Sequence, residues 1–448
     1  MDKKLIPILK EELEKHSGYD SELFVLSGRS QELSLHGSDL ENSEQASYEG
    51  MGLRLFRDNK MAFSYSNMVS LERLRVLFKK VQDALIVVGK DNCYRLPLIQ
   101  SNREAKEDDL LNIRDDKLFS VNALERQGLL EESAKQALNF DKRIKQILRS
   151  AYSQAEAQMW LINSNGGQVY EQSTYCGTGF SCLADANGDT QVGSYSAGKR
   201  YFDDIDFKFV ALESAKRTCA LLEGKKIPSG RSRVLLDPTV AVDFLDLIAT
   251  SVNADMIQKK KSFLVGMIKK KIGSSALNIV DDPTLSKGLG SSHFDDEGIP
   301  TSKLSIVKQG VFENMLYDTY TANKDNVAST GNASRGSFKT LPSPGSSNFL
   351  ILPGIRTRED MISDIQNGVY VMEVMGMHMA DPISGDFSVG IAGIRIEKGE
   401  MTHSVKGITL AGNLRDFMNS VCEVGSDTAY FGSYGSPTIL VDGLMIGG

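Results

Sequence analysis

The sequence lacks the motifs of several large enzyme classes. None of its five histidines is followed by glutamate, so it has neither HExxH nor HExxxH, the helical motifs of many zinc peptidases. GxSxG, GxxxxGK[ST] and GxGxxG are also missing, which argues against the usual serine-hydrolase elbow and the common nucleotide-binding loops. A catalytic triad on another fold stays open, because triads are defined by geometry.

Cysteines and long apolar runs are scarce too. The five cysteines are scattered and form no CxxC, which indicates a reducing compartment and argues against a zinc ribbon. No run approaches the roughly 18–20 apolar residues of a membrane span. The apolar run at residues 5–9 is shorter than that of a signal peptide. We therefore expect a cytoplasmic protein that does not enter a membrane.

Charge and composition narrow the possibilities further. The net charge of −7 argues against direct nucleic-acid binding. With 41% hydrophobic and 24% charged residues the composition is that of a globular protein with a sizeable core. A chain of 448 residues predicts two or three domains.

Apolar periodicity predicts an N-terminal module of mixed structure over residues 1–91. Helical spacing favours a helix over 3–15, and alternating residues such as Leu23 and Val25 favour strands over 22–66. A hairpin is expected to turn at Asp58-Asn59. Ser70 is expected to cap the helix that follows.

A middle module is predicted over residues 92–228 and a C-terminal one over 229–448. In the middle we expect a linker over 92–118, helices near 120–139 and 205–223, and strands at 143–150, 155–163, 169–176 and 179–185. The last part contains many short strand patterns and few helices, expected near 238–252, 357–367 and 412–421. The fold class is therefore α+β, with antiparallel sheets and helices first and a sheet-rich, barrel-like domain last.

The segment 281–298 holds the densest group of potential ligands. His293 lies beside Asp295, Asp296 and Glu297. Such a loop could bind a hard cation through oxygens, although it lacks the EF-hand pattern. The commoner outcome is that these carboxylates cap turns and pair with basic groups, and we favour it.

Three further places could bind a substrate. Arg335, near Asn332, could clamp a carboxylate with its guanidinium fork, or could form an ordinary ion pair. His378 lies in a methionine-rich stretch that suits either a flexible binding surface or core filling. The turn Ser384-Gly385-Asp386 could present amides to a peptide, or could only reverse the chain.

Several segments, in order along nearly the whole chain, carry a specific resemblance. They include IVDDPTL (279–285), GSSHFDDEGIP (290–300), TYTA (319–322), STGNASR (329–335), SGDFS (384–388) and VKGITLAGN (405–413). The chain resembles the TldD/PmbA (TldE) family, long labelled modulators of DNA gyrase. The hairpin at 50–63 resembles the N-terminal module of that family.

The resemblance implies which branch of the family the chain is similar to. TldD-type members carry HExxxH on the helix after the strand that opens the C-terminal domain, plus a later ligand. Here the matching stretch, 234–244, offers only Asp237 and Asp243, which at about 100° per residue point to different sides of a helix. The loop 430–437 has no cysteine. The chain therefore looks like the PmbA/TldE branch.

That branch is expected to bind no metal and to hold no catalytic residue. A TldD-type partner would supply zinc and a catalytic glutamate, and the complex would cleave small, unfolded or modified peptides in an enclosed chamber. Without this partner we expect a homodimer. The expected substrate-binding residues are Asp295, Asp296, Glu297, Asn332, Arg335, His378, Ser384, Gly385 and Asp386.

Two other functions stay open. The chain could be an independent hydrolase that uses His293, Asp295, Asp296 and Glu297. It could also be a peptide-binding or regulatory protein without chemistry.

Overall fold

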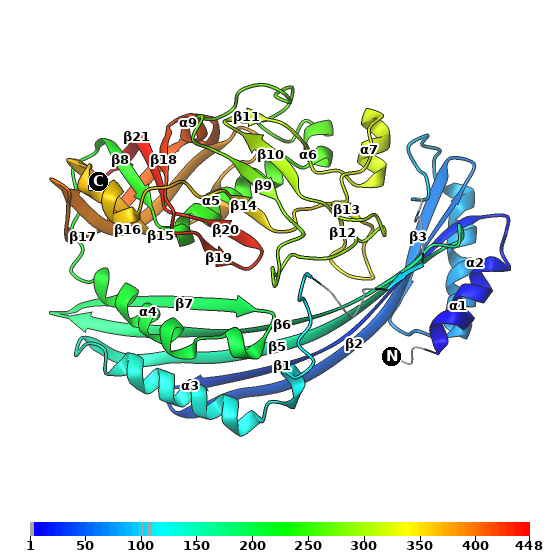
Figure 1. The fold of residues 1–448 in the computed structure, drawn as a ribbon, viewed down its shortest axis with the longest axis horizontal. Helices are drawn as coiled ribbons and strands as arrows, with labels where there is room; N and C mark the ends of the chain where they lie inside the picture. Colours follow the sequence, from blue (N-terminus) through cyan, green and yellow to red (C-terminus); the bar gives the residue numbers. More distant parts are fainter. Residues whose placement is uncertain (1–3, 98, 100–101, 105–109) are drawn as a thin grey trace.

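The computed structural model describes residues 4–448 except 98, 100–101 and 105–109. It confirms the predicted mixture of helices and sheets and the barrel in the C-terminal part. A long curved sheet lies along one side of the molecule, and the C-terminal part lies against it (Figure 1). Of the predicted linker over 92–118, the eight residues named above lie outside the described chain.

The long sheet has seven strands in the order β3-β2-β1-β5-β6-β4, and β7 also pairs with β6. Its strands are β1 (Asp20–His36), β2 (Asp39–Arg57), β3 (Lys60–Ser66), β4 (Asn102–Glu104), β5 (Ile144–Asn163), β6 (Gln168–Ala186) and β7 (Asp189–Lys199). The prediction of separate strands at 143–150 and 155–163, and at 169–176 and 179–185, was wrong. Each pair is one strand, because β1 and β7 continue the hydrogen-bond ladder past the polar interruptions.

Helices cover two parts of this sheet. The elements are α1 (Leu5–Glu14), α2 (Leu71–Val87), η1 (Leu118–Ser120), α3 (Ala123–Leu138), η2 (Phe202–Asp204) and α4 (Phe207–Ala220). Ser70 caps α2 as predicted, since its side chain accepts a hydrogen bond from the amide of Arg73. The hairpin turns at Asp58 and Asn59, both with positive φ, as a two-residue turn requires.

In the C-terminal part, five strands close into a barrel. The order β17-β16-β15-β8-β21-β18 includes the extra pairing of β17 with β21 that completes the ring. The five strands of the ring are β8 (Gly230–Leu236), β15 (Asn367–Met375), β16 (Asp386–Glu397), β17 (Glu400–Asn413) and β21 (Ile439–Gly447), and β18 (Val421–Val424) pairs with β21 outside it. The core of the barrel is apolar and includes Val234, Val371, Ile391 and Leu410.

A second sheet of six strands lies beside the barrel in the order β11-β10-β9-β14-β20-β19. Its strands are β9 (Ile279–Asp281), β10 (Leu304–Lys308), β11 (Val311–Phe312), β14 (Phe349–Ile351), β19 (Ala429–Phe431) and β20 (Tyr434–Ser436), and β12 (Ala333–Ser334) pairs with β13 (Ser343–Pro344). The helical elements here are α5 (Pro238–Ser251), α6 (Ala254–Gln258), α7 (Thr319–Asp325), α8 (Arg358–Ser363), η3 (Met377–Met379) and α9 (Leu414–Asn419).

The strands of the first two predicted modules join in one sheet, because β1 pairs with both β2 and β5. The domain boundaries at 91 and 228 stay a prediction. No helix in the described part of the chain is both long and apolar enough to cross a membrane.

Candidate functional site

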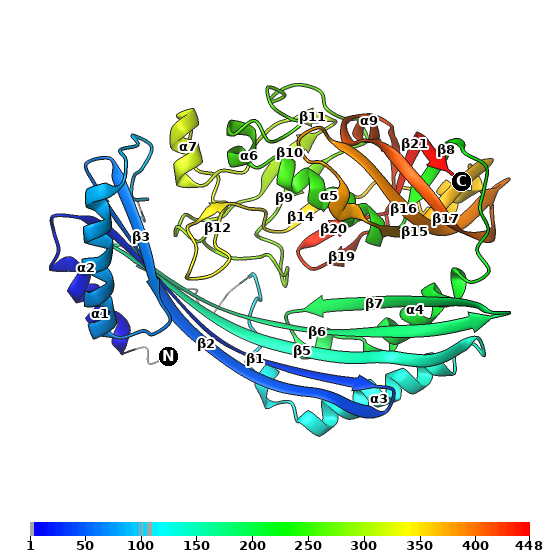
Figure 2. The ribbon, with the colours of Figure 1, turned by 180° about the vertical axis from the view of Figure 1, so that it is seen from behind.

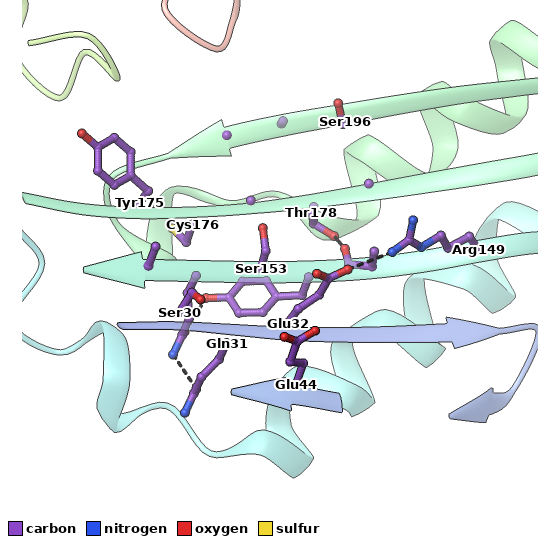
Figure 3. Close-up of a pocket in the computed structure, with 18 residues that line it drawn as sticks. Ser30, Gln31, Glu32, Glu44, Arg149, Ser153, Tyr175, Cys176, Thr178 and Ser196 are labelled. Atoms are coloured by element: carbon purple, nitrogen blue, oxygen red, sulfur yellow. Dashed lines mark hydrogen bonds and ion pairs between the residues drawn. The ribbon is translucent and has the colours of Figure 1, made fainter. Parts of the chain in front are cut away.

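One face of the long sheet forms a trough of small side chains. On the other face Tyr152 and Phe180 are buried beneath α3 and α4. Because side chains alternate along a strand, those of Ala151 and Ser153 point away from the helices, and Gly179, next to Phe180, adds no side chain on that face. They line a hollow of about 580 Å³ on this face of the sheet (Figure 3). We call the face with these residues the trough face.

Charged groups stand at one side of the hollow. Arg149 donates a hydrogen bond to Glu32 over 2.8 Å, and Figure 3 shows the two side chains pointing toward each other. Glu44 lies directly opposite Glu32 on the neighbouring strand. Tyr175 borders the far side. The floor between them carries hydroxyls and glycines, so bulky side chains do not obstruct it.

The hollow adjoins two others, with which it shares lining residues. One, of about 440 Å³, shares Arg149 and Gly179 and reaches Thr239 on α5 and Phe431 on β19. The other, of about 350 Å³, shares Tyr175 and reaches Asp295, Asp296, Asn332 and Arg335. The trough therefore runs along the sheet from the start of α5 to the acidic loop that the sequence singled out.

The acidic loop is held by hydrogen bonds within the fold. Asp295 accepts hydrogen bonds from the amides of Glu297, Ile299 and Ala333 at 2.9–3.0 Å. Burial, and next the neighbouring Glu297, raise the pKa of Asp295 well above its ordinary value. Burial also raises the pKa of Asp296 to about 6, although Arg335 opposes the shift. Asp295 thus caps its own turn, whereas the carboxylate of Asp296 accepts a hydrogen bond from the amide of Arg335, 39 residues away.

Arg335 belongs to a buried ionic network between the long sheet and the C-terminal part. Its guanidinium pairs with Glu22, and both side chains are 1% exposed. Arg54 pairs with Glu22 at 2.5 Å and with Glu297 at 3.0 Å. Burial opposes ionisation of Glu22, but the two guanidiniums outweigh it and hold its pKa below the ordinary value. Two nitrogens of the Arg335 guanidinium are thus used within the protein, whereas its other terminal nitrogen has no hydrogen-bond partner among the described residues. The role of Arg335 as a substrate clamp stays a prediction.

Two neighbours of this network are also engaged. Asn332 donates to Asp281 over 2.6 Å. The ring of His293 lies 2.8 Å from Glu171, a residue of β6, and its amide donates to the same carboxylate oxygen. His293 is thus oriented by the long sheet rather than by the carboxylates next to it in sequence.

The remaining candidates lie elsewhere, around η3 and the start of β16. Here His378, Ser384 and Asp386 are exposed. The amide of Gly385 donates to the carbonyl of Asp381, and that of Asp386 to the Ser384 hydroxyl. Those two amides are thus used within the turn. Their binding of a peptide stays a prediction.

The start of α5 is the stretch in which TldD-type chains are expected to carry HExxxH. Asp237 caps this helix and binds Arg217 at 3.2 Å as well as the hydroxyl of Tyr370. Asp243 is six positions further along and has no histidine or cysteine beside it on α5. Within the described chain no three His, Cys, Asp or Glu side chains are grouped to hold a metal. The donor set does not fit zinc, which prefers nitrogen and sulfur ligands in such sites.

Sequence reasoning missed the residues that complete these arrangements. Glu22, Arg54 and Glu171 lie on long strands and gave no local signal. The one clue that the sequence offered is that Glu22 shares its face of β1 with the apolar Phe24 and Leu26.

Known proteins match the chain over nearly its full length. Three models of PmbA/TldA metallopeptidases match: domain 1 over 21–85, the central domain over 116–222 and the C-terminal domain over 229–448. An uncharacterised protein of Methanocaldococcus jannaschii is 29% identical over 99% of both chains. Metalloprotease PmbA of Escherichia coli O157:H7 is 26% identical, over 92% of this chain and 88% of its own.

Solved structures agree with this match. A proposed modulator of DNA gyrase from Thermotoga maritima superimposes with a TM-score of 0.90 and 25% identity, over 98% of this chain and 100% of its own. TldE from Thermococcus kodakarensis gives a TM-score of 0.86, over 99% of this chain and 100% of its own. At 19% identity that second likeness concerns the fold alone.

Proposed function

Because the chain belongs to the PmbA/TldD metallopeptidase family, we propose that it is the metal-free, TldE-type subunit of a cytoplasmic peptidase. The observation that carries the proposal is α5, PTVAVDFLDLIATS, which has no histidine, glutamate or cysteine where TldD-type chains are expected to carry HExxxH. A TldD-type partner supplies the zinc and the catalytic glutamate.

The chain's own contribution is the trough face. Its floor offers hydroxyls and little side-chain bulk, so an unfolded peptide could lie across it without a particular side chain being selected. The trough reaches α5 at one end, next to the place where the family's active members are expected to hold their metal. The chain thus forms one wall of a chamber in which the partner cleaves small, unfolded or modified peptides.

Two measurements on purified protein test this role. Elemental analysis of the chain alone should find no stoichiometric zinc, and cleavage of an unfolded peptide should require the TldD-type partner. About one zinc per chain, lost in His293→Ala, would instead support the independent hydrolase. The engagement of His293 with Glu171 and of Glu297 with Arg54 argues against that alternative.

A variant in the trough tests the wall itself. Ser153→Trp places a large ring on the floor and should lower peptide cleavage by the reconstituted pair about tenfold or more, while the zinc content of the partner stays unchanged. Lys145→Trp, on the same strand outside the trough, is the matched control. Equal cleavage by both variants would show that peptides do not use the trough. Absence of cleavage with the partner present would favour a non-catalytic binding protein.

A further inference from the structure

Strand β2 leaves part of its outer edge without a neighbouring strand. Its residues 51–57 pair with β3, whereas within the described chain residues 39–50 pair with β1 alone. Side chains 43–49 are all exposed. The order of strands places this segment on the rim of the long sheet (Figures 1 and 2).

The direction of the free backbone groups follows from the ladder. The amide of Ser164 donates to the carbonyl of Ser21, so odd-numbered residues of β1 face β5 and even-numbered ones face β2. Their partners on β2 are also even-numbered, for example Arg54 opposite Glu22. The odd-numbered residues Ser43, Gln45, Ser47 and Glu49 therefore direct their N–H and C=O groups outward.

The charge of this edge indicates what it could bind. Between residues 39 and 50 there are four acids, Asp39, Glu41, Glu44 and Glu49, and no lysine or arginine. Glu44 faces Glu32, whose charge Arg149 already neutralises. A strand edge is usually protected by charged side chains, above all lysine, by proline or by a bulge; from Ser43 to Glu49 this one has only the acids Glu44 and Glu49.

From the unpaired backbone and the uncompensated acids, we propose that the edge Ser43–Glu49 binds an extended, basic polypeptide segment as an added strand. Main-chain hydrogen bonds provide the affinity, as in other strand additions. Lysine or arginine side chains of the added strand lie beside Glu44 on one face and Glu49 on the other. The added strand would lie along the rim of the sheet, where Glu44 also borders the trough hollow.

A second copy of the same edge fits poorly. Pairing two such segments would set four acids against four acids with no base between them, and like charges on adjoining strands are destabilising. The bound segment must therefore bring the opposite charge.

Fluorescence anisotropy with a labelled peptide of alternating lysine and threonine, roughly nine residues long, tests the proposal on the full chain. Ser47→Pro removes an outward N–H without touching the ladder to β1 and should weaken binding about tenfold or more. Ser47→Ala keeps that N–H and should bind as the original chain does. The triple variant Glu41→Gln, Glu44→Gln, Glu49→Gln, or salt at about 1 M, should also weaken binding about tenfold.

Several results would overturn it. Equal binding of a peptide of the same length with alternating glutamate and threonine would show that the acids of the edge do not select a basic segment. Unchanged binding by folded Ser47→Pro, or by the triple glutamine variant if the proline variant does not fold, would refute the site. Light scattering that shows a dimer dissolved by Ser47→Pro would assign the edge to a second copy instead.

Discussion

Replacing Arg335 with methionine should destabilise the fold by about 3–5 kcal/mol, because the change breaks a buried ion pair from one side. Arg335 and Glu22 are each 1% exposed, so water cannot take over the lost contact. Of the two cations that pair with Glu22 in the described chain, Arg54 alone would remain. The backbone carbonyl of Asp296 would lose the hydrogen bond that it accepts from the Arg335 side chain.

Urea denaturation followed by tryptophan fluorescence measures the effect. Trp160 is the only tryptophan and lies on β5, opposite Val25 of β1, so its signal reports on the sheet that carries Glu22. Arg29→Met is the matched control, because the pair of Arg29 with Glu156 lies on the same sheet with Arg29 50% exposed. Such a pair contributes about 0–1 kcal/mol.

Arg335→Lys separates charge from geometry. Lysine keeps the positive charge but cannot reproduce the fork. Arg335→Lys should therefore lose less stability than Arg335→Met, but still more than about 1 kcal/mol. The ion-pair reasoning is refuted if the free energy of unfolding of Arg335→Met lies within about 1 kcal/mol of that of the original chain while cleavage by the reconstituted pair falls. The prediction of a substrate clamp would then be favoured.

Two further perturbations follow from particular residues. Burial raises the pKa of Asp281 to about 6 in the fold from its ordinary 3.8, so its carboxyl stabilises the fold at low pH and this contribution is lost as pH rises through 6. The free energy of unfolding of Asp281→Asn, relative to that of the original chain, should therefore rise by at most about 3 kcal/mol as the pH rises from 4 to 6. A difference in urea denaturation that does not change with pH would contradict this. Gly310→Ala should cost about 1–3 kcal/mol in thermal unfolding, because φ is +77° and a Cβ would lie 2.1 Å from the Gly273 carbonyl oxygen. Gly18→Ala, with nothing within 4 Å, should change stability little, and equal effects of the two would count against the reasoning.

The candidate site illustrates how far local patterns reach. The sequence placed His293 among carboxylates. In the fold Asp295 caps its own turn, whereas His293 binds Glu171 and Glu297 binds Arg54, both on distant strands. Asp295, Asp296, Asn332 and Arg335 do border one hollow, as a site prediction requires. His378 and the turn at 384–386 were grouped with them only by their chemistry, since nothing in a sequence gives the distance between such loops.

The sequence by itself determined the family, the α+β class and the local features that depend on neighbouring residues. The cap at Ser70 and the turn at Asp58-Asn59 are set by interactions within a few residues, which a pattern can record. Tertiary structure alone decided that β5 runs unbroken over Ile144–Asn163, because its pairing with β1 outweighs the weak alternation in its middle. It also decided that Arg335 meets Glu22, 313 positions away, since a buried charge takes whichever partner the packing of the two parts brings within reach.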